Sequence, residues 1–309
     1  MTISICVATY RRPEGLKRLL NGLNSLQLGA PEPEVALVVT DNDAAGSARP
    51  VCAAARPTLR WPLDYAVEPR RGIAHARNRA LARLAPGTAW VAFLDDDEVP
   101  DSRWLAELLA TQRATGADAV AGPVVPFFEH PIEDWIERGG FFQPRRFEDG
   151  AAIPHAFTGN VLFRASLLDD PLLQPAFADR YALVGGEDRQ FFERVRLAGY
   201  RQHWADRALA TEWVPRSRTN ARWLIRRQFR VGNALAFIEG ETQPGARSRP
   251  RRFARAGVQL LLAIASLPKA RLGGQVTWVR GRQRLATSLG MLWGLLGRTT
   301  EEYRDADTA

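Results

Sequence analysis

Cysteine is scarce in this 309-residue sequence, which contains only Cys6 and Cys52. Two cysteines imply no disulfide framework and fit a reducing compartment. No apolar run reaches the roughly 18 residues that a membrane-spanning helix needs. Met1 leads directly into a strand-like run, so we expect no secretory signal. We therefore expect a cytoplasmic protein.

Two common nucleotide-binding motifs are also missing. No Gly-x-Gly-x-x-Gly follows the first predicted strand, which argues against a dinucleotide-binding fold. No Walker-type Gly-Lys-Ser/Thr sequence occurs, and there is no internal repeat or low-complexity tract. With 46% hydrophobic and 25% charged residues, the chain has the composition of a globular protein with one large domain or two.

The net charge of +8 is unevenly distributed along the chain. Residues 201–309 contain 20 Lys and Arg against 8 Asp and Glu, whereas residues 1–200 contain 22 against 26. An acidic N-terminal part followed by a basic C-terminal part predicts a catalytic domain joined to a region that binds anions. Phospholipid, lipid-linked phosphate and nucleic acid are all candidate partners.

Strand-like and helix-like segments alternate through the first part of the chain. Helical spacing of apolar residues follows the first strand at Leu16, Leu19, Leu20 and Leu23. Such alternation indicates βαβ units and a mainly parallel sheet. The predicted strands comprise residues 3–8, 35–39, 63–67, 90–94, 119–125 and 157–164, and residues 126–155 are predicted to be an irregular insertion over the site.

The central feature is an apolar run, Val91–Leu94, that leads directly into four acids, Asp95–Glu98. A short bounded apolar run is typical of a buried strand, and open α/β sheets bind ligands at the carboxyl ends of their strands. Four adjacent carboxylates repel one another unless a cation neutralises them. A hard divalent ion that bridges carboxylates to phosphates would do so. A solvated acidic turn is the alternative.

Other predicted strands also end in polar residues suited to a nucleotide. Thr9 and Arg11 follow the first strand, Asp41 ends the second, and Arg71 follows the third. A carboxylate can accept hydrogen bonds from a base or ribose, and arginine can pair with phosphate.

Farther along, Gly185-Gly186 precedes Glu187-Asp188 and an amphipathic helix. Carboxylates at a helix N-terminus are stabilised by the helix dipole, so a plain helix cap is one interpretation. Two adjacent acids exceed what a cap needs, and a catalytic base is the other interpretation.

Together these residues resemble the family 2 glycosyltransferases of the GT-A fold, which are inverting enzymes that use nucleotide-diphosphate sugars. The resemblance runs in family order over about residues 2–235. The segment Glu212–Gly232 looks like the bacterial exopolysaccharide branch, similar to succinoglycan glucosyltransferases. The matching blocks are Val7–Arg12, Val39–Asn42, Arg71–Asn78, the Asp95–Asp97 DxD motif, Thr158–Asn160 and Gly186–Asp188.

The resemblance implies an α/β, GT-A fold: a Rossmann-like, mostly parallel sheet flanked by helices. Asp188 would be the general base, supported by Glu187, and Asp97 would bind Mn²⁺ or Mg²⁺ together with the diphosphate. The donor, which we expect to be a UDP-sugar, would contact Thr9, Tyr10, Arg11, Asp41, Arg71, Arg77, Asp95 and Asp96.

The resemblance also implies acceptor or phosphate contacts, which we expect at Asn160, Arg222, Trp223 and Arg226. A solvated helix face is the alternative for the arginines. Processive members of the family carry a Gln-x-x-Arg-Trp element. Here no Gln stands at the matching position before Arg222-Trp223, which favours the addition of a single sugar. His203 is either an additional metal ligand or a packed histidine, and Glu212 lies near the site by family order.

We expect residues 1–240 to form the catalytic domain and residues 241–309 a helical, basic extension. Its two apolar runs, residues 258–265 and 285–296, are too short to span a bilayer. Such runs with nearby arginines are typical of a helix in the lipid headgroup layer. The alternative is a helical hairpin packed on the catalytic domain or on a dimer partner. Arginines precede the runs at 247, 249, 251, 252 and 255, and at 280, 282 and 284.

The sequence therefore predicts transfer of a single sugar to a lipid-linked saccharide or glycolipid in polysaccharide biosynthesis, by a peripheral protein of the inner membrane. A nucleotidyltransferase-like sugar-nucleotide enzyme is one alternative. A basic nucleic-acid or membrane-binding protein without transfer activity is another. No recognised nucleic-acid motif occurs, so we expect no nucleic-acid partner.

Overall fold

The computed structural model describes residues 1–242 and 249–300, which form two compact units. The first comprises residues 1–127, 144–182 and 187–213, and the second the described part of the remainder. Arg247 of the expected basic cluster lies outside the described residues. The expected domain boundary after residue 240 falls within a continuous helix, α7 (Ala221–Thr242), which packs within the second unit.

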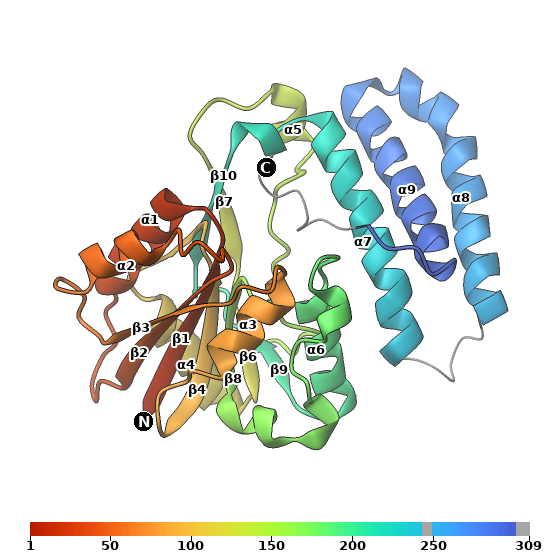
Figure 1. Cartoon of the computed structure of the whole chain (residues 1–309). Coiled ribbons are helices and arrows are strands. Elements are labelled where there is room, and N and C mark those ends of the chain that lie inside the picture. The colour runs from red at the N-terminus through yellow and green to blue at the C-terminus, as the bar shows by residue number, and fades with distance from the viewer. Residues whose placement is uncertain (243–248, 301–309) are drawn as a thin grey trace. The chain divides into compact units, whose positions relative to one another are not determined.

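A seven-stranded sheet forms the centre of the first unit, in the order β3-β2-β1-β4-β8-β6-β9 (Figure 1). Only β8 runs antiparallel to its neighbours. The mostly parallel sheet expected from the alternating pattern is thus confirmed. The strands are β1 (Thr2–Thr9), β2 (Glu34–Asp41), β3 (Leu63–Val67), β4 (Thr88–Asp95), β6 (Ala119–Ala121), β8 (Asn160–Arg164) and β9 (Gln202–Trp204).

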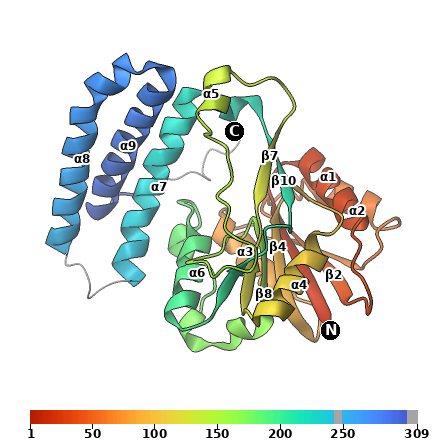
Figure 2. The ribbon, with the colours of Figure 1, turned by 180° about the vertical axis from the view of Figure 1, so that it is seen from behind.

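Helices cover both faces of this sheet because its central strands are apolar on both sides. Ile3 and Ile5 of β1 pack in one core with helices α1, α2 and α4, and Cys6 packs in the opposite core with α3 and α6 (Figure 2). Cys6 and Cys52 are free, buried thiols. The helices are α1 (Pro13–Asn24), α2 (Arg49–Ala55), α3 (Ile73–Leu81), α4 (Trp104–Thr115) and α6 (Glu187–Leu197), with 3₁₀ turns at Ala165–Asp169, Pro171–Leu173 and Asp179–Tyr181.

A small second sheet continues from the acidic stretch. It has the order β5-β10-β7, with β5 (Glu98–Pro100), β10 (Ala210–Val214) and β7 (Val124–Phe128). Because β4 ends at Asp95 and β5 begins at Glu98, Asp96 and Asp97 form a two-residue turn between the sheets. The single strand expected over residues 119–125 is divided into β6 and β7, since Gly122-Pro123 intervenes.

The second unit is helical, and α9 is its central helix. It contains α5 (Asp134–Arg138), a 3₁₀ turn (Arg216–Arg218), α7, α8 (Arg249–Leu272) and α9 (Gly274–Leu295). Helix α9 packs against both α7 and α8. Within the described residues, no helix is long and apolar enough to cross a membrane. The expected helical, basic C-terminal region is confirmed: residues 249–300 contain ten Lys and Arg and no Asp or Glu.

Glycines let α7 and α9 approach closely. A side-chain Cβ at Gly290 would collide with the backbone of Phe229, and one at Gly294 would lie 2.7 Å from Ala236 Cβ. Asn233 of α7 is fully buried beside them and donates to the Arg298 carbonyl at 2.9 Å. The α7–α9 contact is therefore made between backbones, so any side chain at Gly290 must separate the helices.

We expect Gly290→Ala to lower the stability of the second unit by about 1–3 kcal/mol, the usual cost of overpacking. Gly257→Ala on α8 is the matched control, because nothing lies within 4 Å of its added Cβ. Both changes gain the same helix propensity, so their difference isolates the packing effect. Calorimetric melting of the two variants measures it; equal melting temperatures would contradict the close contact.

Candidate active site

The carboxyl ends of β1, β2 and β4 meet at one edge of the large sheet. In the parallel register, Thr9 pairs with Asp41 and Ala8 with Asp95. Thr9, Asp41 and Asp95, which were expected to contact the donor, therefore lie at the ends of adjacent strands.

Burial alternates through the acidic turn: Asp95 and Asp97 are partly exposed, whereas Asp96 and Glu98 are buried. The carboxylate of Asp96 accepts a hydrogen bond from Thr9 Oγ1 at 2.8 Å and pairs with Arg12 Nη1 at 3.1 Å. Burial raises the pKa of Asp96 to about 6, although the Arg12 guanidinium opposes this shift. Asp96 thus ties the end of β1 to the end of β4 and, as placed, points into the fold.

Arg12 is a site residue to which the sequence analysis assigned no role. Its Nη1 atom lies 2.8 Å from Asp97 Oδ2 as well as 3.1 Å from Asp96 Oδ1. The signal that could have found it is the charge argument itself, since four adjacent acids need a cation nearby. The structure supplies part of that neutralisation from the loop after β1.

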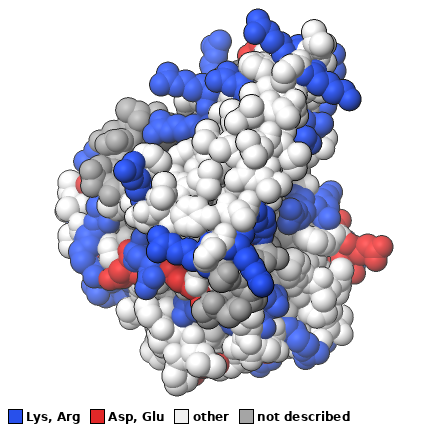
Figure 3. All heavy atoms as spheres, turned by 90° about the vertical axis from the view of Figure 1, so that its right-hand side faces the viewer, with Lys and Arg blue, Asp and Glu red and all other residues white. Residues whose placement is uncertain are grey.

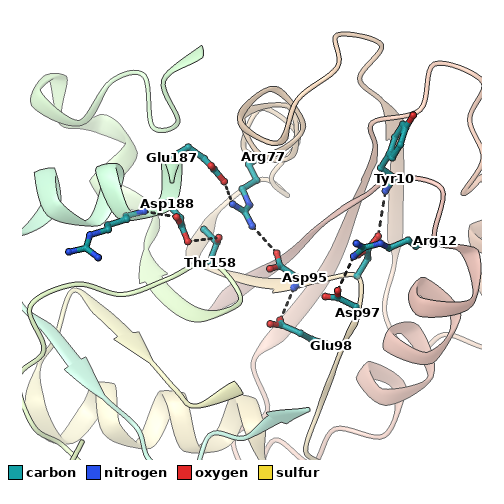
Figure 4. Close-up of polar contacts among 11 residues, drawn as sticks. Tyr10, Arg12, Arg77, Asp95, Asp97, Glu98, Thr158, Glu187 and Asp188 are labelled. Carbon is teal, nitrogen blue, oxygen red and sulfur yellow. Dashed lines mark hydrogen bonds and ion pairs between the residues drawn. The ribbon is translucent and has the colours of Figure 1, made fainter. Parts of the chain in front are cut away.

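Arg77 of α3 joins the acidic turn to the start of α6 (Figure 4). Its guanidinium pairs with Asp95 Oδ1 at 2.8 Å and with Glu187 Oε1. Arg77 and Glu187 are 5% and 2% exposed, so this is an interior ion pair. Burial raises the pKa of Glu187 to about 7, although Arg77 opposes this shift. Arg77 therefore lies between two acids and is suited to position them.

Asp188 is partly exposed next to the buried Glu187. Its Oδ2 atom accepts from Thr158 Oγ1 at 3.4 Å, and its Oδ1 atom accepts from the Arg189 backbone N–H at 2.6 Å (Figure 4). The preceding Gly185 and Gly186 have φ values of 80° and 88°, which explains why glycine occupies both positions. A reachable carboxylate on an anchored helix end can accept a proton.

Asp41 holds the loop that follows β2 by accepting hydrogen bonds from its backbone. It is completely buried, and its Oδ2 atom accepts from the Ala48 N–H at 2.7 Å and from the Tyr65 hydroxyl at 2.9 Å. Direct contact with a base or ribose was expected, but these partners occupy the carboxylate inside the fold. The next residue, Asn42, accepts from the Gly72 N–H at 2.7 Å and so holds the loop that carries Arg71.

Tyr10, Arg11 and Arg71 form a group of exposed or partly exposed side chains at the same edge. The guanidinium of Arg71 lies 3.1 Å from the centroid of the Tyr10 ring, and that of Arg11 lies 5.0 Å from it. Arg11 Nε also pairs with Asp43 Oδ2 at 3.2 Å. An aromatic ring beside two cations is suited to a flat base and to phosphate groups.

Asn160 does not have the expected acceptor-facing position. It is 2% exposed, accepts from Trp104 Nε1 at 2.7 Å, and donates to the Pro123 and Ala208 carbonyls at 3.0 and 2.7 Å. Its amide is used inside the first unit, where it joins β8 to the surrounding loops.

The other expected acceptor residues lie on α7 in the second unit. Arg222 and Arg226 are exposed, and the Trp223 ring stacks on Phe142 with 6.0 Å between centroids. In the first unit, His203 Nδ1 lies 2.8 Å from the Gly150 carbonyl oxygen.

Comparison with known proteins identifies the chain. Residues 4–171 match the model of glycosyl transferase family 2. The chain belongs to this family. It is 32% identical to the succinoglycan biosynthesis protein ExoM of Rhizobium meliloti (strain 1021), over 97% of this chain and 95% of that protein. It is 26% identical to the glycosyltransferase AglE of Haloferax volcanii, over 74% and 71% of the two chains.

Solved structures support the GT-A fold of this glycosyltransferase. The mannosyltransferase PcManGT from Pyrobaculum calidifontis, in complex with GDP-Man and Mn²⁺, has a TM-score of 0.65 at 19% identity, over 94% of this chain and 87% of that chain. TarS 1–349 of S. aureus, in complex with UDP-GlcNAc, has a TM-score of 0.54 at 14% identity, over 96% and 93%. The family and fold expected from the sequence are confirmed.

The acidic turn offers a divalent cation one partly exposed carboxylate, that of Asp97, which also pairs with Arg12. In the described ranges, 1–242 and 249–300, no group of three or more His, Cys, Asp or Glu could hold a metal ion. Mg²⁺-like ions in phosphate chemistry use one or two carboxylates and take further oxygens from the substrate and water. The partly exposed Asp97, beside three further acids, matches that smaller ligand set.

The buried acids make stability depend on pH. Because Glu187 has a pKa of about 7 in the folded protein against an ordinary value of 4.5, the folded state binds more protons between these pH values. Stability from this group is therefore lost as pH rises through that window, and Asp96 acts in the same direction. We expect Glu187→Gln to reduce the fall in melting temperature between about pH 5 and pH 7.5.

The exposed Glu14→Gln is the control and should keep the wild-type pH profile. Melting curves across this range measure the effect. A Glu187→Gln profile parallel to that of the wild type would show that Glu187 titrates normally.

Proposed function

We propose that this glycosyltransferase moves a single sugar from a nucleotide-diphosphate sugar to an acceptor hydroxyl, with inversion at the anomeric carbon. One observation carries the proposal: Arg77 joins the acidic turn to the Glu187-Asp188 pair within one unit. In this proposal, the donor diphosphate binds at the acidic turn. Arg77 holds this turn beside the carboxylate base, as a direct displacement requires.

In this mechanism Asp188 is the general base. Its carboxylate takes the proton of the acceptor hydroxyl as the oxygen attacks the anomeric carbon from the face opposite the diphosphate. A single displacement inverts that centre, so an α-linked donor gives a β-glycoside. Glu187, buried and paired with Arg77, holds the start of α6 and hence the position of Asp188.

The donor lies along the carboxyl edge of the large sheet. Tyr10, Arg11 and Arg71 contact the nucleotide and its phosphates, and Asp95 contacts the ribose or the sugar. Thr9, Asp41 and Asp96 act from within the fold by holding these loops in place. We propose UDP as the nucleotide; the UDP-GlcNAc complex of TarS supports a nucleotide-sugar donor for this fold.

Asp97 would hold Mn²⁺ or Mg²⁺, and PcManGT with Mn²⁺ supports divalent-cation use in this fold. When bound, the ion neutralises negative charge on the leaving diphosphate. Arg12, 2.8 Å from Asp97, holds the side chain that would bind it.

The acceptor is a lipid-linked saccharide or a glycolipid, and the protein acts at the cytoplasmic face of the inner membrane in polysaccharide biosynthesis. The similarity to the succinoglycan biosynthesis protein ExoM supports the place in polysaccharide biosynthesis. Arg222, Trp223 and Arg226 on α7 are proposed to contact the acceptor or its phosphate, and a single sugar is added. Family membership favours sugar transfer over nucleotidyl transfer or simple nucleic-acid binding.

Replacing the base tests the catalytic part of the proposal. Asp188→Asn keeps the side-chain shape but cannot accept the proton, so transfer should fall by a factor of about 10²–10⁴ while donor binding stays near normal. Activity can be followed as nucleotide diphosphate released in the presence of acceptor extract. Asp169→Asn, at an exposed position of the same unit, should keep full activity. Substantial transfer by Asp188→Asn would remove it from this role.

A thermal-shift comparison of UDP, GDP and their sugars, with and without Mn²⁺, tests the donor site. At a ligand concentration 100 times its dissociation constant, the native state gains about 2.7 kcal/mol, which raises the melting temperature. We expect the largest shift with UDP-sugars and Mn²⁺, and its loss in Asp97→Asn. A metal-independent shift in the wild type would overturn the role of Asp97, and no shift with any nucleotide would overturn the donor site.

A further inference from the structure

Helix α8 places its large apolar residues on the outside. Only Ala256 and Ala263 of its 24 residues are buried, whereas α9 buries eight. Val258, Leu261, Leu262 and Leu272 of α8 are 55%, 67%, 66% and 89% exposed. A helix that only completes a bundle directs its large apolar residues inward. Here alanines are the buried residues, and Leu261, Leu262 and Leu272 are left outside.

These four side chains lie on one face of the helix. Positions 258, 261 and 262 follow helical spacing, and residue 272 is ten positions beyond 262, close to three full turns. We call Val258, Leu261, Leu262 and Leu272 the outer face of α8. Exposed apolar residues grouped on one face mark an interaction surface more often than scattered ones do.

Cations lie along the same stripe. Arg251 is seven residues before Val258, and Lys269 is seven residues after Leu262, so both lie at two-turn spacing from the outer face. Both are exposed. Figure 3, viewed from the side on which α8 lies in Figure 1, shows Lys and Arg bordering a broad uncharged surface. An apolar centre with cations at both ends is the result.

Not every arginine of α8 belongs to this surface. Arg255 pairs with Glu239 of α7, and Arg252 lies 3.9 Å from the same carboxylate. These two arginines hold α8 to its own unit. The cations that accompany the outer face are therefore Arg251 and Lys269.

The charge pattern decides between possible occupants. A two-fold pairing of this face with a second copy would bring the cations of the two α8 helices together, and residues 249–300 contain no acid to compensate. Nucleic acid would use the cations but leave the leucines without an apolar partner. A surface of anionic lipid headgroups over acyl chains matches both features.

We propose that the outer face of α8 docks on anionic phospholipid, with its leucines at the boundary between headgroups and acyl chains and its cations on lipid phosphates. This names the surface behind the membrane location in the proposed function. It does not depend on the transfer chemistry, since no residue of the catalytic or donor site takes part.

Vesicle sedimentation with the full chain tests the proposal. We expect binding to vesicles of phosphatidylcholine and phosphatidylglycerol, little binding to phosphatidylcholine alone, and weakening with salt. Leu261→Gln with Leu262→Gln should reduce partitioning about tenfold or more, because two apolar side chains are lost from the contact. Leu172→Gln is the matched control, since this leucine is 72% exposed on the first unit.

The charge is tested with Arg251→Gln and Lys269→Gln together, which should weaken binding and flatten its salt dependence. The exposed Lys17→Gln serves as control. Unchanged binding in both double variants would overturn the proposal, as would equal binding of the wild type to duplex DNA. A dimer that dissociates in the leucine variant, with no vesicle binding, would assign the face to a second copy.

The same preparations separate this inference from the proposed function. Thermal shifts with UDP-sugars should be unchanged in both α8 variants, and Asp188→Asn should still bind vesicles. If the wild type did not bind vesicles, the proposed donor site would be unaffected. If no nucleotide shifted the melting temperature, the proposed lipid-binding surface would be unaffected.

Discussion

The interior ion pair between Arg77 and Glu187 is the constraint on which the candidate site depends. Burying two charges costs more free energy than a simple contact returns, unless each is well placed and further bonded. Arg77 meets this condition by also pairing with Asp95 at 2.8 Å. Helix α3, strand β4 and helix α6 are thereby joined at one point. Removing Arg77 would leave the buried Glu187 without its cation, and removing Glu187 would leave the buried Arg77 paired only with Asp95.

The acidic turn shows how one short segment serves both folding and chemistry. Asp96 and Glu98 point inward, where Asp96 bonds to Thr9 and Glu98 accepts from the Asp95 N–H at 2.8 Å. Burial, with the charges of Asp95 and Asp97, raises the pKa of Glu98 well above its ordinary value. Asp95 and Asp97, at the alternate positions, are partly exposed, and each also pairs with an arginine, Arg77 and Arg12 respectively. Buried, hydrogen-bonded residues next to two partly exposed acids give the fixed geometry that positioning a charged ligand requires.

In the second unit, small residues make the close contacts between helices, whereas several large apolar residues of α8 lie on the surface. Glycines of α7 and α9 allow contact between backbones, and alanines of α8 face α9. The second apolar run buries six residues of α9, although Leu289, Trp293 and Leu296 are exposed. The first run buries only Ala263 of α8 and leaves four large side chains exposed: Val258, Leu261, Leu262 and Ile264. Two segments that read alike by composition thus have different environments, because α9 has helices on two sides and α8 has α9 on one.

The sequence by itself determined the family, the α/β class, the parallel strands and the acids at their ends, because strand and helix periodicities and local motifs are properties of short segments. It also placed Glu187 and Asp188 at a helix start. Only the tertiary structure decided which polar groups face inward. Asp41 and Asn160 read as ligand contacts but are enclosed by partners distant in sequence, such as Tyr65 and Trp104. Likewise, the role of Arg12 and the pairing of Arg77 with Glu187, 110 residues away, depend on how the strands and helices pack. A side chain's partner across the fold leaves no periodic signal in the chain, so sequence patterns cannot reveal it.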